Sequence, residues 1–173
     1  MSSEASADVR GGQLDALKFL PKPIREPRNA WLSVATAWAT SFFPSILLSL
    51  LVATVFPNQP QPQFNFPPAL VLFSVVIFAP VVETLIMGTV LLILLKLFRP
   101  AVAVLISAIG WGIAHSLQYP IWGLTIWWPF LVISTLFVAW RERSLVAAFV
   151  LPMIAHAMQN LPTALLIVSG KHF

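Results

Sequence analysis

The chain has 173 residues, of which 58% are hydrophobic and 9% are charged, and its formal net charge is +4. Because soluble globular domains carry about 25% charged residues, this composition excludes a soluble domain and indicates an integral membrane protein. The lack of cysteine excludes disulfides and thiolate catalysis. The cations flank the hydrophobic segments instead of forming a basic stripe, so no nucleic-acid partner is expected.

The first 30 residues are polar and are interrupted by three prolines. They lack the apolar core and small-residue cleavage site of a signal peptide. Two interpretations stay open for residues 1–30: a disordered cytosolic tail, or a short helix on the membrane surface that uses Leu14, Leu17, Phe19 and Leu20. Residues 31–173 are predicted to form a single membrane-embedded helical domain.

Five hydrophobic segments follow, separated by proline and charge. The predicted segments are approximately 31–56, 68–97, 100–117, 120–140 and 144–169. The uncharged, proline-rich connector between the first two favours an extended loop. The sequence therefore predicts an all-α fold, a polytopic membrane bundle of five to six transmembrane helices.

The second segment is longer than the ~20 residues that are needed to cross the hydrocarbon core. Pro80 is predicted to break it into a short lead-in at about 69–78 and a main helix at about 80–97, because proline suits the first turn of a helix. In that arrangement the unpaired amides of the helix start would stabilise a nearby carboxylate, that of Glu83.

The distribution of cations predicts the orientation. With five spans and a cytoplasmic N-terminus, only Lys171 of the ten Lys and Arg residues lies outside. That asymmetry is what the positive-inside rule predicts. We therefore expect an integral protein of the bacterial inner (plasma) membrane with its N-terminus in the cytoplasm.

Glu83 is the only acidic residue inside the hydrophobic segments, and His115 and His156 also lie in apolar runs. An ionisable residue within a membrane marks a functional site by default. At ~1.5 Å per helical residue, all three lie roughly 20–24 Å from the same membrane face. The three side chains are therefore predicted to converge on one site.

His156 and Asn160 are one helical turn apart and project from one face. Together they offer donors for a developing oxyanion, although interhelical hydrogen bonding is an equally ordinary use of such residues. Glu83 has a structural alternative as a protonated helix–helix contact. A site with one carboxylate and two imidazoles can also hold a divalent metal, but the chain has no His-Glu-x-x-His, so no metal or other cofactor is expected.

Glycines and tryptophans have predicted packing roles. Gly110 and Gly112 are expected to allow close approach of a neighbouring helix. Five tryptophans are expected to anchor the chain at the membrane interface: Trp31, Trp122, Trp127, Trp128 and Trp140.

Three short motifs surround the candidate site residues. They read Pro80-Val-Val-Glu83-Thr84-Leu-Ile-Met-Gly88, Trp111-Gly-Ile-Ala-His115 and His156-Ala-Met-Gln-Asn160. In order and spacing they resemble the Glu-Glu-x-x-x-Arg, Phe-x-x-x-His and His-x-x-x-Asn motifs of the CAAX-protease and bacteriocin-processing (Abi) family of intramembrane glutamic proteases. The resemblance covers about residues 68–165.

The first motif departs from the family pattern, since Thr84 replaces the second Glu and Gly88 replaces the Arg. A Glu-Thr pair still offers one base and a hydroxyl to orient it. The loss of Arg removes the cation that would favour an ionised carboxylate.

The resemblance implies a metal-independent intramembrane endopeptidase. Glu83 and His115 would activate a water, and His156 and Asn160 would stabilise the oxyanion. The partners would be membrane lipid and a peptide or protein substrate with a membrane-associated segment. Two alternatives stay open: a catalytically degenerate relative that serves as a membrane binding, immunity or assembly protein, and a proton-coupled transporter.

Overall fold

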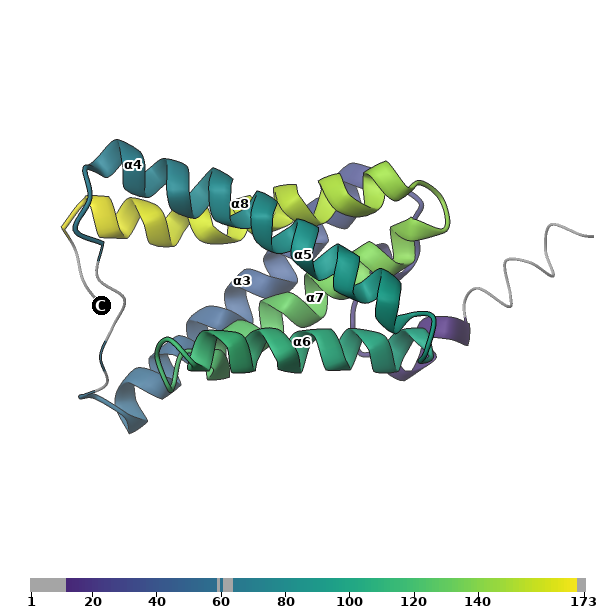
Figure 1. Cartoon of the computed structure of the whole chain (residues 1–173), viewed down its shortest axis with the longest axis horizontal. Coiled ribbons are helices and arrows are strands. Elements are labelled where there is room, and N and C mark those ends of the chain that lie inside the picture. The colour runs from purple at the N-terminus through teal and green to yellow at the C-terminus, as the bar shows by residue number, and fades with distance from the viewer. Residues whose placement is uncertain (1–11, 59, 61–63, 171–173) are drawn as a thin grey trace, which may run out of the picture.

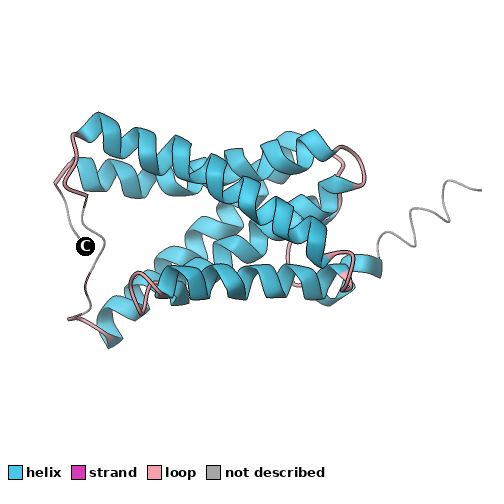
Figure 2. Ribbon diagram, in the orientation of Figure 1, coloured by secondary structure: helices cyan, strands magenta, loops and turns pink. Residues whose placement is uncertain are grey.

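The computed structural model describes residues 12–58, 60 and 64–170, and this part of the chain is helical, without strands (Figures 1 and 2). The predicted all-α membrane bundle is confirmed. The elements in chain order are η1 Gly12–Leu17, α2 Lys22–Arg25, α3 Ala30–Val55, α4 Pro68–Leu72, η2 Phe73–Phe78, α5 Ala79–Leu94, α6 Pro100–Ser116, α7 Gly123–Arg141 and α8 Leu145–Val168.

Four helical stretches are long and apolar enough to cross a membrane: Ala30–Val55, Pro68–Leu94, Gly123–Arg141 and Leu145–Val168. The remaining predicted segment, 100–117, is the shorter apolar helix α6. Their boundaries follow local chemistry. The side chain of Asn29 accepts a hydrogen bond from the Leu32 amide at the start of α3, and Ser144 accepts one from the Ala147 amide at the start of α8.

Helix α7 forms the centre of the bundle, in contact with α3, α6 and α8 (Figure 1). In its most apolar stretch 78% of the residues are buried, against 6% for α3. Two of its buried hydroxyl groups have hydrogen-bond partners. Thr135 donates to the Leu131 carbonyl within α7, and Ser134 shares a 3.1 Å hydrogen bond with Ser107 of α6. The outer helices instead present large apolar side chains outward, as lipid contact requires.

Helices α6 and α7 approach closely where two glycines face each other. A Cβ on Gly112 would lie 3.2 Å from the Gly123 carbonyl oxygen, and a Cβ on Gly123 would collide with the Gly112 carbonyl oxygen and the Ser116 hydroxyl. The packing role predicted for Gly112 is confirmed. The one predicted for Gly110 is wrong, because a Cβ there would meet nothing within 4 Å.

Gly123→Ala is therefore expected to lower the free energy of unfolding by about 1–3 kcal/mol, because a backbone atom cannot move aside as a side chain can. Gly110→Ala is the matched control on the same helix pair. It is expected to be neutral or to stabilise by up to about 1 kcal/mol through helix propensity. Thermal unfolding of both variants in detergent measures the difference, and equal melting temperatures would contradict the close approach.

The predicted break at Pro80 is wrong. The stretch Pro68–Leu94 is one continuous helix, and it widens into π-helical geometry over Phe73–Phe78, just before the proline. The Ala79 amide bonds to the Ser74 carbonyl five residues earlier. A π-bulge absorbs the proline, which would otherwise clash with the preceding turn of an α-helix.

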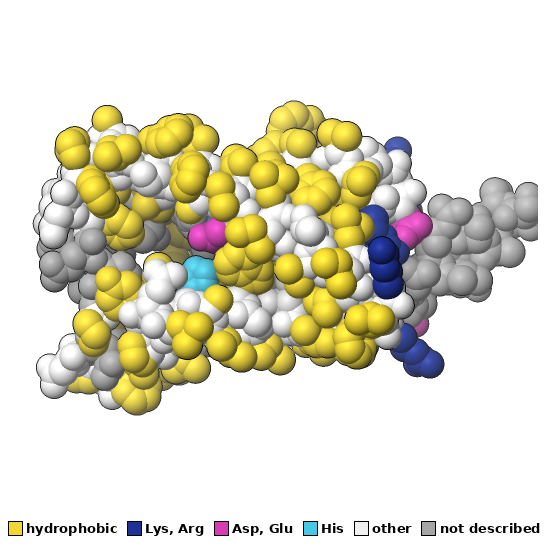
Figure 3. All heavy atoms as spheres, viewed as in Figure 1, with side chains coloured by type: hydrophobic (Ala, Val, Ile, Leu, Met, Phe, Trp, Pro, Cys, Tyr) yellow, Lys and Arg dark blue, Asp and Glu magenta, His cyan; other side chains and the backbone are white. Residues whose placement is uncertain are grey.

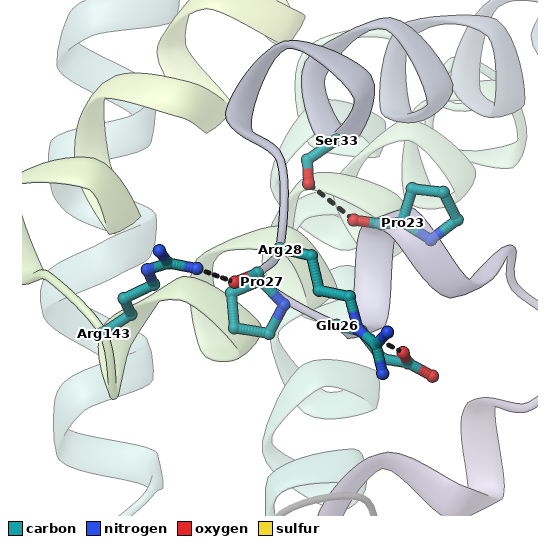
Figure 4. A network of polar contacts seen from close by, with 6 residues as sticks. All are labelled: Pro23, Glu26, Pro27, Arg28, Ser33 and Arg143. Atoms are coloured by element: carbon teal, nitrogen blue, oxygen red, sulfur yellow. Dashed lines mark hydrogen bonds and ion pairs between the residues drawn. The ribbon is translucent and has the colours of Figure 1, made fainter.

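Residues 14–33 pack against the end of the bundle that carries the turn between α7 and α8. Leu14, Leu17 and Leu20 are at most 5% exposed, so these side chains pack into the protein. Figure 4 shows two of the polar contacts that hold the segment: the Ser33 hydroxyl donates to the Pro23 carbonyl at 2.6 Å, and Arg143 donates to the Pro27 carbonyl at 2.5 Å.

Candidate functional site

Helices α5 and α8 bring Glu83 and His156 together. The Glu83 Oε2 atom lies 3.6 Å from the His156 Nε2 atom. The Glu83 side chain is 26% exposed and the His156 side chain 7%. This separation is within ion-pair range but longer than a hydrogen bond. Figure 3 shows an acidic and a histidine side chain side by side among hydrophobic residues at the middle of one face, at the edge of a hollow.

The imidazole of His156 is oriented by burial more than by hydrogen bonds. Its Nδ1 atom has no hydrogen-bond partner among the described residues. If the neutral ring carries its hydrogen on Nε2, that N–H points toward Glu83, and only the acceptor lone pair of Nδ1 is left without a partner. This tautomer is the less costly one, because a buried unpaired N–H is rarer than a buried unpaired acceptor.

His115 lies near the end of α6 and is 8% exposed. Its Nδ1 atom is 2.9 Å from the Trp111 carbonyl oxygen. Since a carbonyl can only accept, Nδ1 carries the hydrogen and Nε2 presents a lone pair. The ring is thus prepared to accept a proton or a hydrogen bond at Nε2.

An aromatic cluster, which the sequence patterns did not identify, links the two imidazoles. The ring of Phe130 on α7 stacks on Trp111 at a centroid distance of 4.4 Å. The same ring lies 5.8 Å from the His115 ring and 5.3 Å from the His156 ring. Trp122 packs edge-on against His115 at 5.0 Å, so its predicted role as an interface anchor misses this contact. No motif marks Phe130; only the packing of α7 between α6 and α8 shows its place.

Asn160 forms a hydrogen bond with the π-helical segment. Its Nδ2 atom donates to the Val75 carbonyl oxygen at 3.0 Å. The reason lies in Pro80: in π geometry the Val75 carbonyl would accept from residue 80, which has no N–H, and the Ala79 amide is already bonded to Ser74. Asn160 therefore supplies the missing donor, and one of its two amide hydrogens is committed to that bond.

Replacing Asn160 by leucine is expected to lower the free energy of unfolding by about 1–3 kcal/mol, because the Val75 carbonyl loses its donor in an apolar setting. Gln159→Leu is the matched control, since the Gln159 Oε1 atom is buried with no partner among the described residues. Chemical unfolding in mixed micelles should show a loss for the first variant only. Equal losses would show that the Val75 bond is not what Asn160 contributes.

Two predictions about the surroundings of Glu83 are wrong. The helix continues on both sides of Pro80, so no free helix start supplies amides to the carboxylate. The Thr84 hydroxyl does not orient Glu83 either, because Thr84 is fully buried and its Oγ1 atom has no partner in the described part of the chain. Adjacent helical residues project about 100° apart, which directs Thr84 into the bundle.

The space beside Gly88 is filled by aromatic rings. A Cβ at this position would lie 2.6 Å from the Phe137 ring and would also collide with Phe149, and those two rings pack edge-to-face at 5.0 Å. Thr84 and Gly88 lie one helical turn apart, so a Glu and an Arg at these positions would form an i,i+4 ion pair. This chain lacks both partners, and so neither charge is left unpaired.

Among the described residues, no group of three or more His, Cys, Asp or Glu side chains is arranged to hold a metal ion. The third histidine, His172, lies outside the described residues. The structure thus pairs the Glu83 carboxylate with the His156 Nε2 atom and places His115 near His156 through the shared contact with Phe130. Among the described residues no hydrogen bond or ion pair joins His115 to Glu83, so the predicted convergence of all three side chains is observed for Glu83 and His156 only.

The chain matches a known family model. The model that matches is described as type II CAAX prenyl endopeptidase Rce1-like, and it covers residues 65–162. The matched stretch includes all three motifs. No curated protein and no solved structure matches the chain.

Proposed function

The chain belongs to the Rce1-like family of type II CAAX prenyl endopeptidases, which are intramembrane proteases, and from this premise we propose that it hydrolyses a peptide bond of a membrane-associated substrate without a metal. The observation that carries the proposal is the 3.6 Å approach of Glu83 to His156 from two separate membrane helices. A carboxylate and an imidazole placed together within apolar helices are suited to proton transfer.

Glu83 acts as the general base in this mechanism. A water between Glu83 and His115 gives one hydrogen bond to the carboxylate and one to the free Nε2 lone pair of His115. Its oxygen attacks the peptide carbonyl carbon while the proton moves to Glu83. The protonated Glu83 then transfers that proton to the leaving amine nitrogen as the C–N bond breaks, which yields a carboxylic acid and an amine.

His156 stabilises the tetrahedral oxyanion through its Nε2–H. The second Nδ2 hydrogen of Asn160 is available for the same purpose, because the first is bonded to Val75. Removing one oxyanion donor typically costs about 10²–10³ in rate. The Trp111–Phe130 stack keeps the two imidazoles in position, since both rings pack against Phe130.

The cationic end of the protein faces the cytoplasm in this proposal. Figure 3 shows the Lys and Arg side chains gathered at one end of the molecule. That end carries the α5–α6 and α7–α8 turns and residues 18–28. The positive-inside rule assigns it to the cytoplasmic side of a bacterial inner membrane.

The test is a cleavage assay on the purified chain in proteoliposomes that contain a pool of membrane-anchored peptides. In water enriched in ¹⁸O, the new carboxyl group is expected to contain one ¹⁸O atom, and cleavage should persist in the presence of a chelator. Loss of cleavage on chelation, restored by zinc, would overturn the metal-free mechanism. Products without ¹⁸O would overturn direct attack by water.

One observation favours a second function, a non-catalytic membrane protein that binds a peptide. Gly88 is enclosed by Phe137 and Phe149, so the Arg of the family motif has no room in this chain. A binding protein would retain peptides from the same pool uncut, and the variant Glu83→Gln would retain them as well as the unaltered chain does.

A further inference from the structure

A cavity of about 530 Å³ lies at the cationic end of the bundle, between residues 14–27 and the turn that joins α7 to α8. Ligand sites commonly enclose about 300–1,000 Å³. None of its lining residues belongs to the cluster around Glu83, so it is a separate feature of the molecule.

Two arginines, Arg25 and Arg143, line the cavity. Each is held in place by one backbone carbonyl: Arg25 Nε donates to Leu20 at 2.9 Å, and Arg143 Nη1 donates to Pro27 (Figure 4). Arg143 also lies 5.6 Å from the centre of the Trp140 ring. A guanidinium has five N–H donors, so four on each arginine remain for an anion.

The acidic residue in the lining does not neutralise these arginines. Glu142 is paired with Arg141, which donates to it from both Nε and Nη2. Among the described residues neither Arg25 nor Arg143 has a carboxylate within ion-pair distance. The cavity therefore has an excess of positive charge.

The remaining lining is apolar. Leu14, Val138 and Ala139 are at most 8% exposed and contribute to its wall. The cavity lies at the end of the molecule where Lys and Arg gather, the level at which lipid headgroups meet a membrane protein (Figure 3). A ligand that fits such a site has an anionic group joined to an apolar part.

We propose that this cavity binds the phosphate group of an anionic phospholipid. The phosphate lies between the guanidinium groups of Arg25 and Arg143, and the first carbons of the acyl chains lie against Leu14 and Val138. Arginine suits this role because its planar fork matches phosphate geometry. The bound lipid would join residues 14–27 to α7 and α8 and so stabilise the folded chain. The proposal is independent of any peptidase activity.

The test uses the full chain, delipidated in detergent, with titration of phosphatidylglycerol, phosphatidylcholine or inorganic phosphate. Bound lipid is counted by native mass spectrometry, and the melting temperature is recorded at each concentration. Phosphatidylglycerol is expected to stay bound and to raise the melting temperature, and phosphatidylcholine to do so roughly tenfold more weakly. An equal effect of both lipids would overturn the charge recognition.

Variants separate the cavity from general surface charge. The double variant Arg25→Gln/Arg143→Gln is expected to weaken phosphatidylglycerol binding by roughly tenfold or more, and the control Lys96→Gln/Arg99→Gln, at the same end of the molecule, to leave it unchanged. Ala139→Leu keeps both arginines and narrows the cavity at its apolar wall, so it should also weaken binding. This variant decides the matter if the double arginine variant does not fold.

Each remaining outcome overturns part of the proposal. Equal losses for the two double variants would show a diffuse electrostatic effect, and undiminished binding by Ala139→Leu would place the lipid elsewhere. Inorganic phosphate that binds as tightly as phosphatidylglycerol, with the same dependence on the arginines, would make the site one for a soluble phosphate and overturn the assignment to lipid.

Discussion

Glu83→Gln is expected to reduce peptide hydrolysis by a factor of at least about 10²–10⁴, the usual contribution of a general base. Glutamine keeps the shape of the side chain and its approach to His156 but cannot accept a proton from water. No other carboxylate lies within the hydrophobic segments to take over the task. The measurement is the initial rate of cleavage in proteoliposomes for the purified variant and the unaltered chain.

The control for this variant is Glu26→Gln, which removes a carboxylate that is paired with Arg28 far from the site. It should cleave at the unaltered rate. Both variants must show the melting temperature of the unaltered chain in detergent, so that lost activity is not lost folding. Cleavage by Glu83→Gln at the unaltered rate would refute the assignment of Glu83 as the base.

Gly88→Arg, which restores the family residue, is expected to destabilise the protein strongly instead of improving it. Even the Cβ of Gly88→Ala would meet the Phe137 and Phe149 rings, and overpacking of this kind typically costs about 1–3 kcal/mol. The arginine would add a buried charge whose i,i+4 partner is Thr84 and not Glu, and an unpaired buried charge typically costs about 3–5 kcal/mol.

A double-mutant cycle tests this interpretation. Phe149→Leu should recover part of the loss in Gly88→Ala, with an interaction of about 0.5–3 kcal/mol as expected for residues in contact. Gly110→Ala in the Phe149→Leu background is the matched control and should show no coupling. Free energies of unfolding from denaturant titration in micelles give the cycle. A fully stable Gly88→Arg variant would show that position 88 is not enclosed by these rings.

The approach of Glu83 to His156 could be anticipated because helix geometry converts sequence position into membrane depth. A fixed rise per residue, counted from cations at one membrane face, places both at one level. Depth does not specify rotation about the helix axis, however. The direction of the Thr84 hydroxyl, away from Glu83, and the enclosure of Gly88 depended on which faces α5 turns toward α7 and α8.

The predictions that failed concern contacts between different helices. Pro80 suggested a break because local rules consider one helix at a time. The break is absent because the π-bulge absorbs the ring and Asn160, eighty residues later, supplies the donor that Val75 lacks. Gly110 and Gly112 look alike in sequence, but only Gly112 faces Gly123. Phe130 gave no signal at all, since an aromatic residue in an apolar run has no distinguishing pattern.

Composition and the pattern of hydrophobic segments by themselves determined that this is an all-helical membrane protein, roughly where its five apolar segments lie, and which polar residues lie within them. These properties follow from the cost of placing charges and open backbone in hydrocarbon, a cost that each segment meets independently. Tertiary structure alone decided which side chains touch across helices: the partner of Asn160, the rings beside Gly88 and the aromatic link between the imidazoles. Those contacts depend on the rotation and register of packed helices, which arise only when distant segments fill the same space.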